Sequence, residues 1–198
     1  MANEYGTLTA LKSRLSIEAD DTSRDTLLTS ALGAASRSID KACGRRFWLD
    51  AAPVARTYRP AGRVARGADG ELLLVDDIGS ATSLVVETGS AASWTAVTGY
   101  ETSPDNALVD GQAITGLRRL GGSWGASTGR VRVTARFGWP AVPDDITEAA
   151  LIQASRLYKR KDSPEGIIGS AEWGVRSLSR RDPDVWALIE PYILPGFA

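Results

Sequence analysis

Two apolar patterns divide this chain, and the division constrains its fold more than any other feature. Towards both ends, apolar residues recur every three or four positions, as on the buried face of a helix. Between residues 45 and 137 the chain is instead rich in glycine, threonine and valine, with short runs between turns. This order predicts an α+β protein, a small bundle of about four helices with an inserted antiparallel β subdomain.

The expected domain boundaries lie where the pattern changes. Residues 1–44 hold a short helix capped by Thr7 and a long helix that ends at Gly44. Residues 45–140 form the β-rich insertion. Residues 141–198 complete the bundle with two helices, a long loop and a tail. Each flanking segment would leave an apolar stripe uncovered by itself, so the two are expected to pack together.

Local signals define the individual helices. In the first long helix, from about residue 23 to 43, the inner stripe is expected to be Leu27, Leu28, Ala31, Ala34, Ala35, Ile39 and Ala42. Asp144 is expected to cap the next helix through its carboxylate. Asp182 is expected to cap the last helix, with Pro183 at the first helical position, where a missing amide is tolerated.

Within the insertion, residues 130–137 are the clearest strand because apolar and polar residues alternate there. Segments 71–76 and 82–87 are expected to be two neighbouring strands. The Asp76–Asp77 pair would then lie in the turn that ends the first of them. Shorter strand candidates follow at 93–97, 106–109 and 113–117.

No pattern of catalytic or metal-binding residues stands out. The chain has no histidine and a single cysteine, Cys43, which we interpret as a packing residue. Histidine triads, most zinc sites and internal disulfides are therefore excluded. Neither a P-loop nor a GxSxG motif occurs. We expect no enzyme activity, no cofactor and no metal; a hydrolase using Asp76 and Asp77 is a minor alternative.

Charge and hydropathy limit the partners. The net charge of -1 argues against a dedicated nucleic-acid binder, which is usually strongly basic. The longest purely aliphatic run, Leu72–Val75, is far too short to cross a membrane. No signal peptide is visible, since Glu4 stands where an apolar region would be needed. We expect a soluble protein made in a reducing cytoplasm, without membrane contact.

Three groups of residues are candidates for contacts with other molecules. They are a basic strand face (Arg130, Arg132 and Arg136), a glycine-rich loop (Ile167, Ile168, Trp173 and Arg176) and an apolar tail (Ile193, Leu194, Pro195 and Phe197). The basic face either pairs with acidic neighbours or faces phosphate or another subunit. The loop either folds back on its own bundle or is covered by a partner. Apolar residues beyond the last helix suggest docking onto another chain.

Several short stretches, in a consistent order, resemble the head–tail connector (adaptor) proteins of tailed bacteriophages. They are Thr102-Ser103-Pro104-Asp105-Asn106, Gly138-Trp139-Pro140, Val142-Pro143-Asp144-Asp145 with the alanine-rich helix after it, Lys161-Asp162-Ser163-Pro164-Glu165-Gly166, and Ser179-Arg180-Arg181-Asp182-Pro183-Asp184-Val185. The order of helices and strands fits as well, so the resemblance covers nearly the whole chain. None of these stretches is a chemical signature, and segments 62–70 and 119–129 match no motif of the family.

The resemblance implies a structural protein of the virion neck, assembled in the host cytoplasm. It implies a homo-oligomeric, dodecameric ring below the portal protein. The ring would extend the channel through which genomic DNA passes non-specifically, and would dock a stopper or tail-completion protein. By the same resemblance, the helices build the ring and the tail reaches the portal. We expect the glycine-rich loop with Trp173 to contact a neighbouring subunit or the next ring.

The residues leave a second function open, a carbohydrate- or ligand-binding β module in which an exposed tryptophan stacks on the ligand. Trp94 lies in a strand candidate. Trp124 lies in a Gly-Gly-Ser-Trp-Gly stretch that is expected to form an exposed hairpin tip. This alternative predicts ligand binding without a ring.

Overall fold

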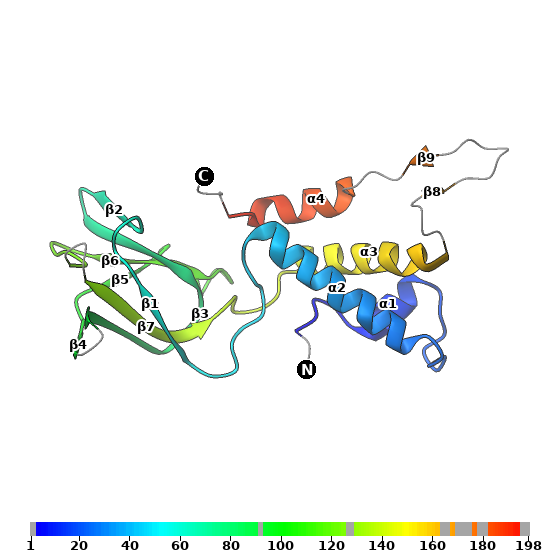
Figure 1. The fold of residues 1–198 in the computed structure, drawn as a ribbon, viewed down its shortest axis with the longest axis horizontal. Coiled ribbons are helices and arrows are strands. Elements are labelled where there is room, and N and C mark those ends of the chain that lie inside the picture. Colours follow the sequence, from blue (N-terminus) through cyan, green and yellow to red (C-terminus); the bar gives the residue numbers. More distant parts are fainter. Residues whose placement is uncertain are drawn as a thin grey trace. The chain divides into compact units, whose positions relative to one another are not determined.

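The computed structural model describes residues 3–90, 93–125, 129–162, 167–168, 176–177 and 182–194. The chain forms two compact units, a helical unit of Met1–Arg45 with Val142–Ala198 and a β unit of Arg46–Ala141 (Figure 1). The expected α+β class, a small helical bundle with an inserted antiparallel β subdomain, is confirmed. In the part of the chain that the structure describes, no helix is long and apolar enough to cross a membrane.

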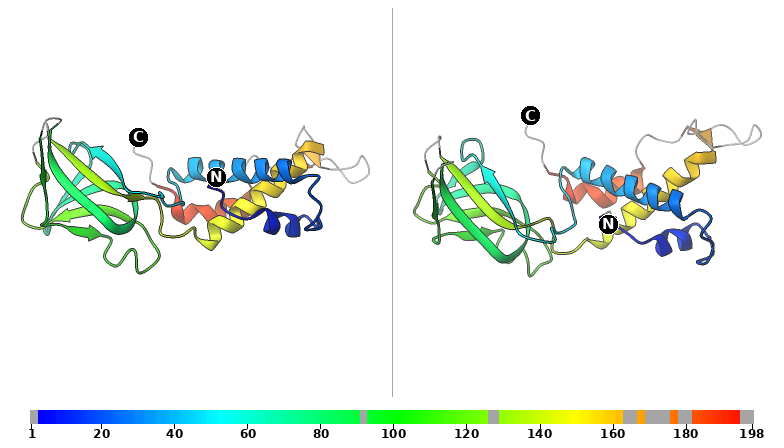
Figure 2. Two further views of the ribbon diagram at one scale, coloured as in Figure 1. Left: turned by 90° about the horizontal axis from the view of Figure 1, so that it is seen from below. Right: turned by 60° about the horizontal axis from the view of Figure 1, so that its bottom comes forward.

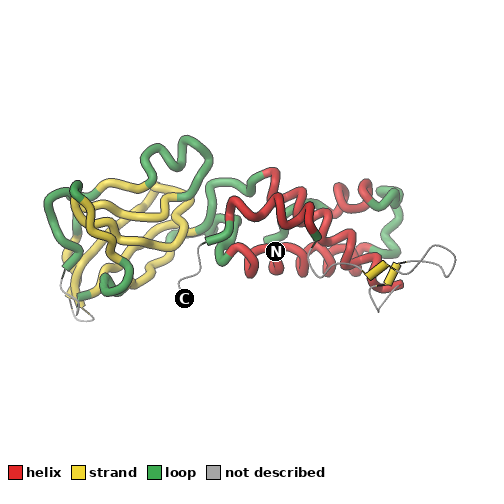
Figure 3. The backbone as a smooth tube through the Cα atoms, turned by 90° about the horizontal axis from the view of Figure 1, so that it is seen from above, coloured by secondary structure: helices red, strands yellow, loops and turns green. Residues whose placement is uncertain are grey.

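The helical unit is built around one central helix. Its helices are α1 (Leu8–Arg14), α2 (Asp25–Cys43), α3 (Asp144–Lys159) and α4 (Pro183–Ile189). Helices α1, α2 and α4 all pack against α3, and Figure 3 shows these helices in red. The core between α1, α2 and α3 consists of Leu11, Leu28, Leu32, Ala35, Leu151, Ala154 and Tyr158.

Three of the expected helix ends are confirmed and one is wrong. Thr7 caps α1, since its hydroxyl accepts a bond from the Ala10 amide. Gly44 ends α2 in the left-handed conformation, and Asp182 caps α4. Asp144, in contrast, is the first residue of α3 rather than its cap, and no side chain caps this end. Its charge still lies in the first turn, where the helix dipole favours it.

The inner stripe expected for α2 is partly wrong. The side that packs against the bundle carries Leu28, Leu32, Ala35, Ser36, Ile39 and Cys43. Leu27, Ala34 and Ala42 are exposed, and Leu27 retains 55% of its accessible surface. Helix α2 therefore has a wider apolar sector than its own bundle covers.

The β unit is a single antiparallel sheet wound around one long strand. Its strands are β1 (Val54–Tyr58), β2 (Val64–Gly67), β3 (Gly70–Ser90), β4 (Ser93–Ala96), β5 (Glu101–Ser103), β6 (Ile114–Arg119) and β7 (Arg130–Phe137). The path through the sheet is β1-β7-β3-β6-β5, and β2 and β4 also pair with β3. Figure 2 shows these strands from two further sides.

The two neighbouring strands expected at 71–76 and 82–87 are in fact parts of β3. Register shifts between Leu74 and Ile78 and between Ser80 and Val85 let one strand bend and pair with β6 in its first half and β7 in its second. The Asp76–Asp77 pair therefore lies inside a strand, because a bulge tolerates polar residues that otherwise indicate a turn. The strand expected at 106–109 is also wrong, since this segment forms turns.

The chain enters and leaves the β unit at one corner. The rings of Phe47 and Trp139 lie 5.3 Å apart between centroids, and Phe47 is fully buried. The Trp139 indole donates to Asp77 Oδ2 at 3.1 Å. Gly138, which precedes Trp139 in the chain, lies against the Trp48 backbone, and its φ of +112° is easily adopted only by glycine.

Candidate functional site

The start of the C-terminal tail is held on the helical unit. The Leu194 amide donates to the Cys43 carbonyl at 2.9 Å, and the Leu194 side chain lies beside Gly44. Leu194 remains 40% exposed and Ile193 is half-buried. Two other tail candidates, Pro195 and Phe197, lie outside the described residues. Leu194 thus lies at the C-terminal end of α2.

The glycine-rich loop contains a short antiparallel pair of strands. Strand β8 (Ile167–Ile168) pairs with β9 (Arg176–Ser177), with Ile167 opposite Ser177 and Ile168 opposite Arg176. Trp173 lies outside the described residues. The structure therefore brings Ile167, Ile168 and Arg176 together in one ladder.

The basic strand face is engaged within its own unit. Arg132 donates from Nε and Nη2 to the two carboxylate oxygens of Glu87, at 2.6 and 2.8 Å. These hydrogen bonds hold the pKa of the Glu87 carboxyl below its usual value. The Arg132 guanidinium also lies 4.5 Å from the ring centroid of Trp94.

Its two neighbours on β7 bond to backbone oxygens. Arg136 Nε donates to the Asp50 carbonyl at 2.8 Å, and Arg130 Nη1 donates to the Gly129 carbonyl at 3.1 Å. This geometry favours the structural interpretation of the face, since each arginine has a partner close in its own unit.

The expectation that Trp124 lies at an exposed hairpin tip is wrong. Its side chain is 1% exposed, and its indole nitrogen donates to the carbonyls of Glu71 and Leu117 at 3.0 and 3.1 Å. The Trp124 amide donates to the Glu71 carboxylate at 2.8 Å. A buried tryptophan whose donors are satisfied fixes the loop and offers no stacking surface. Trp94, beneath Arg132, is half-buried.

The paired aspartates do not share a site. Successive residues of a strand point to opposite faces. Asp76 accepts from Arg56 at 2.7 Å and from the Tyr58 hydroxyl at 3.2 Å, whereas Asp77 accepts from Trp139. Burial raises the pKa of Tyr58, and the Asp76 carboxylate raises it further. Over the described ranges, no group of three His, Cys, Asp or Glu residues could hold a metal ion.

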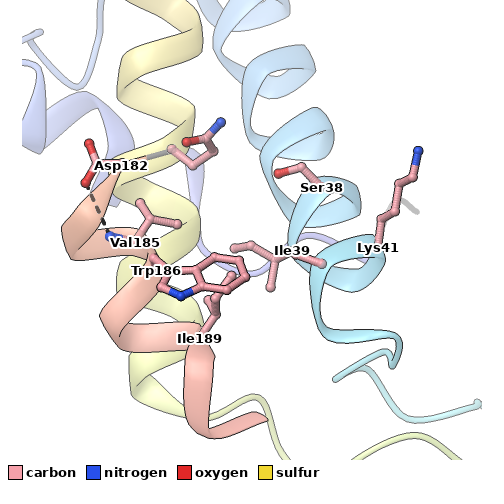
Figure 4. Close-up of a pocket in the computed structure, with 9 residues that line it drawn as sticks. Ser38, Ile39, Lys41, Asp182, Val185, Trp186 and Ile189 are labelled. Carbon is pink, nitrogen blue, oxygen red and sulfur yellow. Dashed lines mark hydrogen bonds between the residues drawn. The ribbon is translucent and has the colours of Figure 1, made fainter. Parts of the chain in front are cut away.

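The helical unit has a groove of about 340 Å³ between α2 and α4, with α3 behind it (Figure 4). It is lined by Ser38, Ile39, Lys41, Ala42, Gln153, Asp182, Val185, Trp186 and Ile189. Figure 4 shows the Trp186 indole and Ile39 pointing towards each other from the two walls. Sequence reasoning missed this groove, which exists because α2 and α4 both pack on α3. The small and polar residues of α2 opposite Trp186 are the signal that could have indicated it.

No protein-family model and no curated protein matches the chain. Chains of solved structures share its fold, and two of them illustrate the likeness. One is a chain in the neck of an empty gene transfer agent (GTA) particle computed with C6 symmetry, with a TM-score of 0.55 and 18% identity. The other is a chain in the virion of a native GTA particle, with a TM-score of 0.56 and 20% identity. Each match covers 96% of this chain and 90% of the other, so the likeness includes both units.

Proposed function

We propose that the chain is a structural head–tail adaptor in the neck of a phage-like particle. The observation that carries this proposal is the fold shared with a chain of a GTA neck over 96% of this chain. The short stretches that resemble phage connector proteins are a second, separate support. The adaptor forms a dodecameric ring below the portal protein, extends the channel for genomic DNA, and docks a stopper or tail-completion protein.

The work of such a protein is geometric, and the proposal assigns it no reaction. The groups that first suggested chemistry have structural partners. Asp76 and Asp77 bond to different neighbours, and Cys43 is buried in the bundle. A net charge of -1 suits a channel component, because strong phosphate binding would slow the passage of DNA.

Each candidate contact group has a place in this proposal. The tail, from Ile193 and Leu194 to Phe197, reaches the portal from the end of α2. The loop with Ile167, Ile168, Trp173 and Arg176 contacts a neighbouring subunit or the next ring. The basic face of β7 lies towards the channel or a subunit interface, with Arg132 the least available member because it donates two hydrogen bonds to Glu87.

The location of the chain in finished particles tests the proposal. An epitope-tagged chain in purified particles should be labelled at the portal vertex in electron micrographs. Adding the purified chain to portal rings should add one layer of density in negative stain. A chain that is absent from finished particles and stays free in the producing cells would end the proposal.

Deletion of residues 195–198 tests the tail assignment separately. The contact between Leu194 and Cys43 remains in this variant, so helical circular dichroism and the thermal midpoint should not change. Attachment to portal rings should be lost. Normal attachment of the truncated chain would show that the tail does not reach the portal, and would leave the neck location intact.

A further inference from the structure

The outer face of α2 carries apolar residues that the helical unit leaves largely exposed. Leu27, Ala31, Ala34, Ser38 and Lys41 follow one another at spacings of three and four, so they share one side of the helix. All are exposed except Ala31, which is half-buried. Small side chains on such a side let a second helix approach closely, to about 8–10 Å between axes. We call these five residues with Ala42 the α2 outer face.

This face continues into the groove. Ser38, Lys41 and Ala42 belong to both, and Trp186 with Val185 supplies apolar surface on the opposite wall. Lys41 is exposed, and Figure 4 shows its side chain extending away from the indole. Among the described residues, Lys41 has no ion-pair partner. The α2 outer face therefore combines apolar surface with an available positive charge.

Helix α4 has an outer side of the opposite charge. Asp184, Ala187 and Glu190 are exposed and lie three residues apart, so they share one side of α4 and the turn after it. The helix and the turn that follows it contain no basic residue. Within the described ranges, neither Asp184 nor Glu190 has an ion-pair partner. We call these three residues the α4 acidic face.

We propose that the α2 outer face of one copy binds the α4 acidic face of the next copy, with Lys41 opposite Glu190 and Asp184. The two faces are different patches of one chain, so the contact is head-to-tail and closes into a ring when its rotation permits. Apolar contact from α2 contributes affinity, and the complementary charges fix direction and register. This interface rests on the proposed ring and specifies the surfaces that build it.

A charge exchange between the two faces tests the interface. Self-association of the full chain is measured by native mass spectrometry and sedimentation over a concentration series. Lys41→Glu alone and Glu190→Lys alone should each associate at least about tenfold more weakly, because an attractive pair becomes a like-charge contact. An equimolar mixture of the two variants should recover the wild-type oligomer, since copies that alternate always place a glutamate opposite a lysine.

Lys159→Glu is the matched control, because Lys159 is an exposed lysine in the last turn of α3 and belongs to neither face. Its association should equal that of the wild type, and circular dichroism should show all three variants folded. Single variants that assemble normally, or a mixture that does not recover, would overturn the interface.

Zero-length carbodiimide cross-linking between unlabelled and ¹⁵N-labelled chains provides the second measurement. Mixed-isotope peptides joining Lys41 to Glu190 or Asp184 are expected. A wild-type chain that stays monomeric and gives only cross-links within one copy would overturn the proposal. So would variants that form normal rings but no longer attach to the portal, since the face would then belong to the portal contact. Either result leaves the proposed neck location standing.

Discussion

At the scale of single residues, Gly138 carries the most specific constraint. It closes the corner of the β unit with a φ of +112°. A Cβ atom at this position would lie 1.9 Å from the Trp48 carbonyl oxygen. The obstacle is backbone, which cannot rotate away as a side chain can. The Gly-Trp-Pro stretch that contributed to the resemblance therefore has a steric reason in the structure.

Gly138→Ala should lower the free energy of unfolding of the β unit by at least about 2 kcal/mol, through backbone strain and the forced shift at Trp48. Urea unfolding followed by tryptophan fluorescence measures it. Gly99→Ala is the control, since a Cβ there meets nothing within 4 Å. Equal effects of the two substitutions would contradict the steric explanation.

Cys43 gives a prediction about pH. Burial of its thiol raises the pKa of Cys43 to about 11. The unfolded chain therefore releases the thiol proton at a lower pH than the folded one. The contribution of the protonated Cys43 thiol to the free energy of unfolding is therefore complete below pH 9 and is lost as the pH rises towards 11.

The loss of stability at high pH should occur in the wild type and be absent from Cys43→Ala, which has no thiol. Cys43→Ala has the lower thermal midpoint because the substitution leaves a cavity. The difference in thermal midpoint between wild type and variant should become smaller between pH 9 and pH 11, because only the wild type loses stability there. Thermal melts at a series of pH values measure it. A difference in thermal midpoint that stays constant over this pH range would contradict the raised pKa of the Cys43 thiol.

At the scale of elements, α4 is short and depends on its first residues. The Asp182 carboxylate accepts from the amides of Asp184 and Val185 at 3.0 and 3.3 Å, and pairs with Arg156 on α3 at 3.2 Å. A helix of seven residues has little stability alone. The cap and the ion pair together hold α4 in its place on α3.

Asp182→Ala should therefore destabilise the helical unit by about 1–2 kcal/mol. Asp184→Ala, two residues further on, removes a carboxylate that has no such bonds with the described residues, and should change stability by less than about 0.5 kcal/mol. Chemical unfolding followed at the helical circular-dichroism band compares them. Equal stabilities of the two variants would show that the Asp182 cap does not stabilise the helical unit.

Element types followed from the sequence where periodicity was strong, as for α2, α3 and β7. The failures have local causes. Strand β3 contains polar and glycine residues at its bulges, which look like a turn unless the pairing partners are known. On α2, Leu27 and Leu28 are equally apolar, and only the packing of α3 decides which one is buried.

Contact surfaces were harder to predict from the sequence than helices and strands were. Trp124 lies among glycines, yet bonds to Glu71 and Leu117 from other strands draw it into the core. The partner of Arg132 is Glu87, which is 45 residues away and becomes its neighbour only in the β3–β7 register. The groove beside Trp186 depends on the packing of α2 and α4 on α3, and the sequence shows only one part of it, the small and polar residues of α2.

At the scale of the whole molecule, each unit has its own core. Among the described residues, one core cluster consists of β-unit residues alone, among them Val133, Phe137, Leu117 and Trp124. Its two chain ends meet at Phe47 and Trp139. A segment with adjacent ends and a separate core is expected to fold by itself.

Residues 46–141 produced alone should therefore give a β-type circular-dichroism spectrum and a single cooperative unfolding transition. Phe47→Ala in the same fragment should destabilise it by about 3–5 kcal/mol, because it empties a fully buried site where the ends meet. A fragment without cooperative unfolding would show that the β unit needs the helices.

The adjacent entry and exit at Phe47 and Trp139 have an evolutionary and practical consequence. For the bundle, the whole insertion is equivalent to a loop, so related proteins could exchange this insertion for another while the helices keep their continuity. A fluorescent protein or affinity handle with similarly close termini could be grafted at the same junction.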